Sequence, residues 1–223
     1  MKSQKTISPQ EISLWLTPNF AVCFLLFLNC FIGAYSYSVH SPTVDFFTWW
    51  AVPHGLARQY VQIPYTDENR KKLAEKIKGE IETTKSPNIE RETFDDVLDF
   101  YNGRIISTAS PFFYAVFSHC VSDNYQLDKR KFIIVSLLLF TLTIFILGRL
   151  LNFSYPALFV FYSLITTSFA PYLSEAKVGN VNQIQLFLVS IFILLSIKKN
   201  SFYSLVGAGF FLGLSALLKA NMG

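Results

Sequence analysis

The chain of 223 residues is 52% hydrophobic and 17% aromatic, and its formal net charge is only +4. Its lysines and arginines do not accompany a nucleic-acid-binding motif, so we expect no nucleic-acid partner. The apolar residues fall in long blocks, close to the roughly 20 residues that a helix needs to cross the hydrocarbon core of a bilayer. The sequence therefore predicts an all-α, multi-pass protein of the plasma or inner membrane, surrounded by membrane lipids.

The first predicted membrane helix covers residues 18–37, after a polar and mildly basic stretch at residues 1–17. The apolar run is too long for the core of a signal peptide, and no small-residue cleavage site follows it. Because positive charge beside a membrane helix favours the cytoplasmic side, Lys2 and Lys5 predict a cytoplasmic N-terminus.

Residues 38–130 are predicted to form a large extracytoplasmic loop with interfacial helices. We expect a first helix over residues 44–60 to lie in the plane of the membrane interface. Four of its apolar side chains are then expected to face lipid: Phe46, Trp49, Trp50 and Val52.

Three further helices are predicted in this loop. Residues 66–85 repeat an apolar residue at four-residue spacing among acids and lysines, which is typical of a solvated surface helix. Residues 92–102 predict a second acidic helix. Residues 110–121 are apolar but too short to span a bilayer, so we interpret them as an interfacial or re-entrant helix.

Residues 131–223 are predicted to hold transmembrane helices two to five. Their apolar runs cover residues 132–149, 154–172, 181–197 and 202–219. Because the last run ends close to Gly223, we expect the chain to be a fragment, or an early stop, of a longer protein.

Two topologies compete, and they differ in whether residues 110–121 cross the membrane. If these residues do not cross, Arg149, Lys198 and Lys199 are cytoplasmic and residues 129–131 lie outside. If they do cross, residues 129–131 become cytoplasmic, but Lys198 and Lys199 do not. We prefer the first topology, because long external loops follow the positive-inside bias poorly.

Two polar features then meet on the outer face. Asp45 is the one acid in an aromatic-rich stretch directly after the first span. Asn180, Asn182 and Gln183 stand at the mouth of the fourth span, where amides are costly unless they are paired or line a wet cavity. Lys219 lies at a similar depth near the end of the fifth span. A carboxylate in this position suits the deprotonation of a hydroxyl on a lipid-borne substrate.

Four segments carry a resemblance to a known family. They read D-F-F-T-W-W-A…G-L…I-P-Y at 45–65, S-P-F-F-Y-A-V-F at 110–117, G-N-V-N-Q-I-Q-L-F-L at 179–188 and G-F-F-L-G-L-S-A-L-L-K at 209–219. In order and spacing they resemble the N-terminal half of GT-C glycosyltransferases, especially glycosyltransferase family 87, of the polyprenyl-phosphate-mannose-dependent mannosyltransferase type. The chain departs from that family's usual Tyr-Pro-Pro, Gly-Gln-Val-Asn and Lys-Pro patterns at Ser110, Asn180 and Ala220.

The resemblance implies a GT-C-like membrane fold and a metal-independent, inverting transfer outside the cytoplasm. The donor would be a hexose, most simply mannose, on a polyprenyl phosphate, and the acceptor would be a hydroxyl of a lipid or glycan. The family's first-loop acid, its general base, maps onto Asp45. The resemblance implies no cofactor, because the lipid-linked sugar phosphate is itself a substrate.

Several residues are candidates for substrate binding. The leaving phosphate needs cationic or amide donors, which Arg58, Lys177 or Lys219 could supply. The three amides at the fourth span could bind sugar hydroxyls. His54 could assist at the acceptor or the phosphate, and Tyr65 could stack on a sugar or an isoprenoid.

Each candidate also has a plainer interpretation. Asp45 could cap the helix that follows it, and the cationic side chains could contact headgroups or solvent. The amides could hydrogen-bond between helices, and the rings could form an interfacial belt. No spacing typical of a metal site or a disulfide relates Cys23, Cys30 and Cys120, so we expect three small apolar fillers.

Two other function classes stay open. The chain could be a transporter or flippase-like protein in which the amides line a path, although we expect no interrupted or inverted-repeat helices in this length. It could also be an inactive, truncated member of the transferase family.

Overall fold

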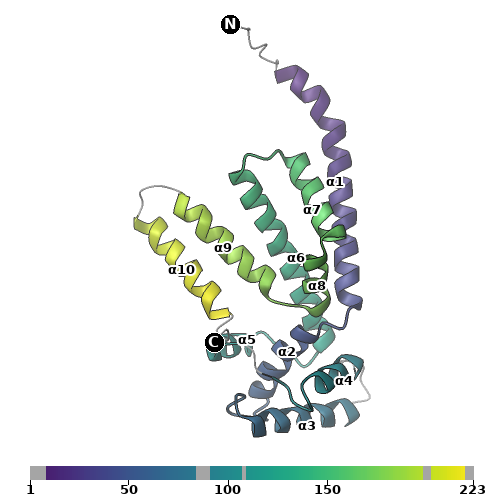
Figure 1. Ribbon diagram of the computed structural model, residues 1–223, viewed down its shortest axis with the longest axis vertical. Coiled ribbons are helices and arrows are strands. Elements are labelled where there is room, and N and C mark those ends of the chain that lie inside the picture. Colours follow the sequence, from purple (N-terminus) through teal and green to yellow (C-terminus); the bar gives the residue numbers. More distant parts are fainter. Residues whose placement is uncertain (1–8, 84–90, 107–108, 198–201, 219–223) are drawn as a thin grey trace.

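The computed structural model describes residues 9–83, 91–106, 109–197 and 202–218, and every regular element in these ranges is a helix (Figure 1). The helices are α1 (Pro9–His40), α2 (Val44–Ala57), α3 (Asp67–Thr83), α4 (Arg91–Phe100), α5 (Pro111–Phe117), α6 (Tyr125–Leu150), α7 (Tyr155–Ser168), α8 (Ala170–Val178), α9 (Asn182–Ile197) and α10 (Phe202–Leu218). The all-α membrane fold predicted from the sequence is confirmed.

Two described helices are long and apolar enough to cross a membrane, namely residues 19–40 of α1 and the whole of α6. Helices α7 and α8 make a third candidate if they are counted as one bent span. Helices α9 and α10 are apolar but have only 16 and 17 residues, fewer than the roughly 20 that a straight span needs. Of the five predicted spans, two or three are therefore long enough to cross a membrane by length and composition, and the predicted fourth and fifth spans are shorter apolar helices.

The segment predicted as one straight span over residues 154–172 is broken. Helix α7 ends at Ser168, the backbone of Phe169 is extended, and α8 leaves at an angle of 67°. Pro171 stands in the first turn of α8, where its missing N–H is tolerated at the start of a helix but would interrupt the middle of one. The expectation that the chain has no interrupted helix is wrong at this position.

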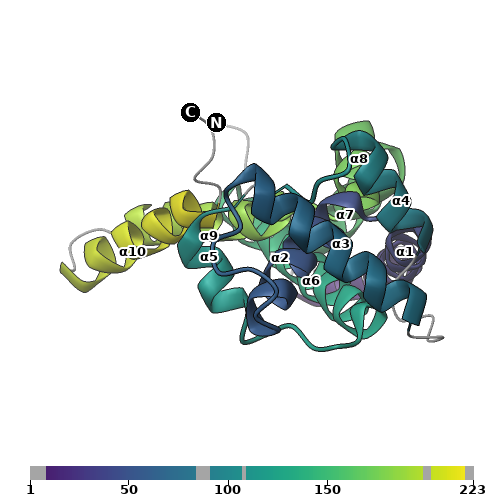
Figure 2. The same ribbon diagram turned by 90° about the horizontal axis from the view of Figure 1, so that it is seen from below.

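Helices α2 to α5 form a compact layer at one end of the bundle, called the cap below (Figure 1). Figure 2 looks onto the cap and shows α3 on its outer side. The predicted apolar stripe of α3 is confirmed, because Leu73 and Ile77 are fully buried against the cap core.

The prediction that α2 lies in the interface with its rings in lipid is wrong. Phe46, Trp49, Trp50 and Val52 are between 0 and 4% exposed. Helix α2 is the centre of the cap and contacts α3, α4, α5 and α8. It is hydrophobic all round because it is buried all round, and an interfacial helix would instead need a polar face.

The start of α6 fastens the cap to the bundle. The Trp50 indole donates to the carboxylate of Asp128 over 3.2 Å. The fully buried Lys129 donates to the Ser41 carbonyl over 2.9 Å, where α1 turns into the cap. Residues 129–131 were predicted to lie outside, and Lys129 is at the cap end of α6. Its ammonium group satisfies a buried carbonyl, which is how a buried ammonium is retained.

The two ends of the bundle differ. The cap lies at one end, whereas the α6–α7 turn and the facing ends of α9 and α10 lie at the other (Figure 1). This arrangement agrees with the topology in which residues 110–121 do not cross. Helix α5 covers only Pro111–Phe117 and packs within the cap and against α10.

Candidate functional site

The candidate site is built where the start of α2 meets the turn after α8. Thr43 adopts a left-handed backbone conformation, and its N–H donates to the Lys177 carbonyl over 3.1 Å. Gly179 ends α8 with a φ of 71°, and a Cβ at this position would lie 2.9 Å from the Cβ of Phe46. Only glycine fits so close an approach at a positive φ without strain.

This junction brings Asp45 to Asn180. The Nδ2 of Asn180 donates to Oδ2 of Asp45 over 2.9 Å. Asp45 lies within the first turn of α2, where the exposed N–H dipoles favour a negative charge. The alternative that Asp45 caps its helix does not hold, because the N-cap position is Thr43. Of the three predicted amides, Asn180, in the turn before α9, therefore meets the first-loop acid.

Tyr101, just after α4, is influenced by the charge of this carboxylate. Burial, and secondarily the negative charge of Asp45, raise the pKa of the half-buried Tyr101 phenol. The phenol therefore stays protonated at neutral pH and can donate a hydrogen bond. Sequence analysis did not single out Tyr101, and the loop position of its Phe-Tyr-Asn-Gly stretch gave no signal for it.

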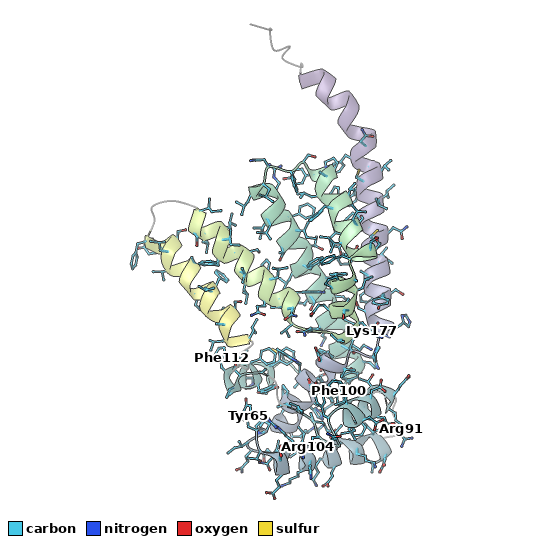
Figure 3. The ribbon with its side chains drawn as sticks, in the orientation of Figure 1. Tyr65, Arg91, Phe100, Arg104, Phe112 and Lys177 are labelled. Carbon is cyan, nitrogen blue, oxygen red and sulfur yellow. The ribbon has the colours of Figure 1, made fainter. Side chains whose placement is uncertain are left out.

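Lys177 is exposed in the last turn of α8, and Figure 3 places it at the border between the bundle and the cap. Its backbone carbonyl accepts from the Thr43 N–H, so the backbone of Lys177 is part of the Asp45 junction. Lys219, the other predicted phosphate ligand of this region, lies outside the described residues.

The remaining amides border an apolar groove of about 470 Å³ between α6, α7, α8 and α9. Asn182 and Gln183 line it beside Glu175, while its walls are mainly rings and aliphatic side chains. Gln183 also lines a smaller pocket together with Asn180. The groove thus ends in polar groups that adjoin the partner of Asp45.

His54 and Arg58 belong to a different cluster, at the far end of α2. His54 contacts Glu80 at 3.1 Å and stacks on Trp50, and Arg58 donates to Asp123 over 3.1 Å. This hydrogen bond raises the pKa of Arg58 and lowers that of Asp123. At about 1.5 Å per residue, His54 is roughly 13 Å along the helix from Asp45. The structure does not bring these two candidates to the acid.

Tyr65 is likewise committed elsewhere. Its hydroxyl donates to the Ala109 carbonyl over 3.3 Å, and burial raises its pKa to about 12. Its ring centroid lies 6.3 Å from that of Tyr114, within the part of the cap that holds α5. The structure does not bring Tyr65 to Asp45, and its hydroxyl and ring contacts are with other residues of the cap.

The described residues contain no group of three or more His, Cys, Asp or Glu side chains that could hold a metal ion. The three cysteines are free thiols. Cys23 and Cys30 are half-buried in α1, as expected of apolar fillers, but Cys120 is exposed.

The fold and this junction define an all-helical membrane protein with an acid–amide pair at the border between its bundle and its cap. A comparison with family models matches residues 108–221, just over half of the chain, to glycosyltransferase family 87. The chain therefore belongs to glycosyltransferase family 87. No curated protein and no solved structure matches it.

The family match makes the chain a membrane glycosyltransferase, for which lipid and glycan substrates are the general class. It covers α5 to α10 and includes Asn180, but it does not reach Asp45. The case for Asp45 therefore depends on the contact between the two residues.

Proposed function

We propose that the protein transfers a hexose, most simply mannose, from a polyprenyl-phosphate donor to a hydroxyl of a lipid or glycan on the extracytoplasmic face. The single observation that carries this proposal is the 2.9 Å hydrogen bond from Asn180 to Asp45, next to the polar end of the apolar groove. It joins an acid of the cap to the family-matched part of the bundle.

Asp45 acts as the general base of this reaction. Its carboxylate accepts the proton of the acceptor hydroxyl as the oxygen attacks C1 of the donor sugar, and the bond from C1 to the phosphate oxygen breaks. The polyprenyl phosphate leaves with the bonding electron pair, and direct attack inverts the configuration at C1. Asn180 holds one carboxylate oxygen, and Tyr101 offers a neutral donor nearby.

The groove supports a lipid-borne donor. A volume of about 470 Å³ with mainly apolar walls suits part of an isoprenoid chain, and its amide end would lie nearest to the phosphosugar. Lys177, next to the Asp45 junction, is the described cation that we assign to balance the phosphate charge. Lys219, which lies outside the described residues, was predicted from the sequence for the same role. The mechanism uses no metal or cofactor.

The test is Asp45→Asn, with exposed Asp96→Asn on α4 as its matched control. Transfer is measured in membranes with radiolabelled polyprenyl-phosphate mannose, and donor binding is measured separately. Removing a general base costs about 10²–10⁴-fold in turnover, so Asp45→Asn should lose turnover and keep donor binding. Undiminished transfer would end the assignment of Asp45.

A further inference from the structure

Three buried polar atoms belong to residues that line one small pocket behind the Asp45 junction. They are Oγ of Ser136 on α6, Oε2 of Glu175 on α8 and Oδ1 of Asn180. None of them has a hydrogen-bond partner among the described residues. All three residues line the same pocket of about 10 Å³, between α1, α6 and the α8–α9 turn. An unsatisfied buried polar atom is costly, so three in one place require an explanation.

Ser136 differs from the other hydroxyl residues of its helix. Thr141 and Thr143 donate to the carbonyls four residues earlier, over 2.8 and 2.9 Å. Such bonding within the helix is the usual way to satisfy a hydroxyl in an apolar segment. Ser136 is 5% exposed and does not do this. Its hydroxyl is therefore available to the pocket.

The donor and acceptor count identifies what the pocket holds. The Asn180 amide turns its NH₂ group to Asp45, so its oxygen faces the pocket as an acceptor. The Glu175 carboxylate is also an acceptor, so the two side chains cannot bond to each other while Glu175 is ionised. One water molecule can donate to both and accept from Ser136. Buried waters typically make about three such bonds, and about 10–15 Å³ suffices to hold one.

We propose that Ser136, Glu175 and Asn180 bind one structural water molecule, and that this water makes Glu175 a positioning residue for Asp45. The water fixes the Asn180 oxygen on the pocket side, which keeps the NH₂ group on the carboxylate of Asp45. The water site stands on the contacts alone, whereas the positioning role rests on the proposed function.

A structure at high resolution tests the water site directly. We expect a density peak about 2.7–3.2 Å from each of the three oxygen atoms. A peak at about 2.3–2.6 Å with further oxygen ligands would indicate a cation instead and would overturn the proposal. A direct hydrogen bond between the Glu175 and Asn180 side chains would overturn it as well.

Kinetics with radiolabelled polyprenyl-phosphate mannose test the positioning role. Glu175→Leu should lower kcat by about tenfold and leave KM for the donor within about twofold, because a misplaced base affects turnover rather than binding. Glu175→Gln retains an oxygen acceptor for the water and should restore most of kcat. Combined with Asn180→Ala, the Glu175→Leu change should add almost nothing, because both act through one water.

Two outcomes would contradict this role. Additive losses of kcat in the Glu175→Leu, Asn180→Ala double variant would contradict it, and so would a rise in KM with kcat unchanged. Either result would mean that Glu175 only lines the groove and does not position Asp45. Ser136→Ala should reproduce part of the kcat loss, whereas Thr141→Val, whose hydroxyl bonds within its own helix, should not. If Asp45→Asn retains full transfer, the assignment of Asp45 as general base fails and the positioning role of Glu175 fails with it, but the density peak still decides the water site.

Discussion

Asn180 donates a hydrogen bond to Asp45 across 135 positions of sequence, from the bundle to the cap. The amide nitrogen is the group that the carboxylate needs, because an oxygen in its place would repel the negative charge. The orientation of this one side chain therefore decides whether the acid is supported or opposed.

Asn180→Asp tests this relationship. The variant replaces the donor by a second carboxylate of the same shape, so we expect transfer to fall by about 10²-fold or more through like-charge repulsion. Gln185→Glu is the matched control, because Gln185 donates to the Ser215 carbonyl on α10 and not to the site. Its turnover per folded molecule should be unchanged, and equal losses in both variants would contradict the special role of Asn180.

Gly179→Ala tests the junction that delivers Asn180. The positive φ and the 2.9 Å approach to the Phe46 Cβ predict a loss of about 1–3 kcal/mol in stability. Gly209→Ala is the control, since a Cβ there meets nothing within 4 Å. Thermal unfolding in detergent compares the two. An unchanged Tm in Gly179→Ala would mean that the α2 and α8 backbones are not held this closely.

Leu147→Trp tests the apolar groove. Leu147 lines it on α6, so the larger ring should fill space and raise KM for a polyprenyl-phosphate donor by about tenfold, with a smaller change in kcat. Leu142→Trp, at an exposed position of the same helix, should leave both constants near wild type. Similar constants in the two variants would remove the groove from the donor site.

Cys120 offers a test of topology in the natural sequence. It is exposed next to α5, on the cap end of the bundle, whereas Asn152 lies in the turn between α6 and α7 at the other end. A thiol reagent that does not cross membranes should label Cys120 from outside intact cells. Asn152→Cys in a Cys120→Ser background should react only after permeabilisation. The reverse pattern would place the cap in the cytoplasm.

The Arg58–Asp123 pair predicts a small pH effect. The folded-state pKa of Asp123 is lowered from 3.8, so the pair stabilises the protein above that pH and ceases to do so as the pH falls through the lowered value. Because Asp123 is 71% exposed, the effect should be slight. The Tm difference between wild type and Asp123→Asn should therefore be small at pH 6, begin to shrink below about pH 3.8 and vanish once the pH is below the lowered pKa of Asp123. A difference that grew with acidity would contradict the ion pair.

Much of the fold could be read from hydrophobic periodicity. The charged stripe of α3 and the long apolar run of α6 can each be recognised from the residues of a single helix. The lipid-facing assignment of Trp50 failed because a uniformly apolar helix looks the same whether lipid or protein surrounds it. Burial of Lys129 also depends on a distant carbonyl, at Ser41, which no local pattern reveals.

The site was predicted in part for similar reasons. Asp45 and Asn180 stood out because polar groups are rare beside membrane segments. His54 and Arg58 are close to Asp45 in sequence, but the rise of α2 carries them to its other end. Glu175 and Ser136 could not be identified from the sequence. What sets them apart is that their buried side-chain oxygens lack hydrogen-bond partners among the described residues, which no local pattern reveals.

The acid lies in the cap and its amide partner in the bundle, and next to this pair the two layers are joined by the backbone hydrogen bond from Thr43 to Lys177 and the tight turn at Gly179. A separation of these layers by about one or two ångströms would break the hydrogen bond between Asn180 and Asp45, and so lower activity, while every helix stayed intact. Warming, or a thinner bilayer, should therefore abolish activity under conditions in which the protein is still folded.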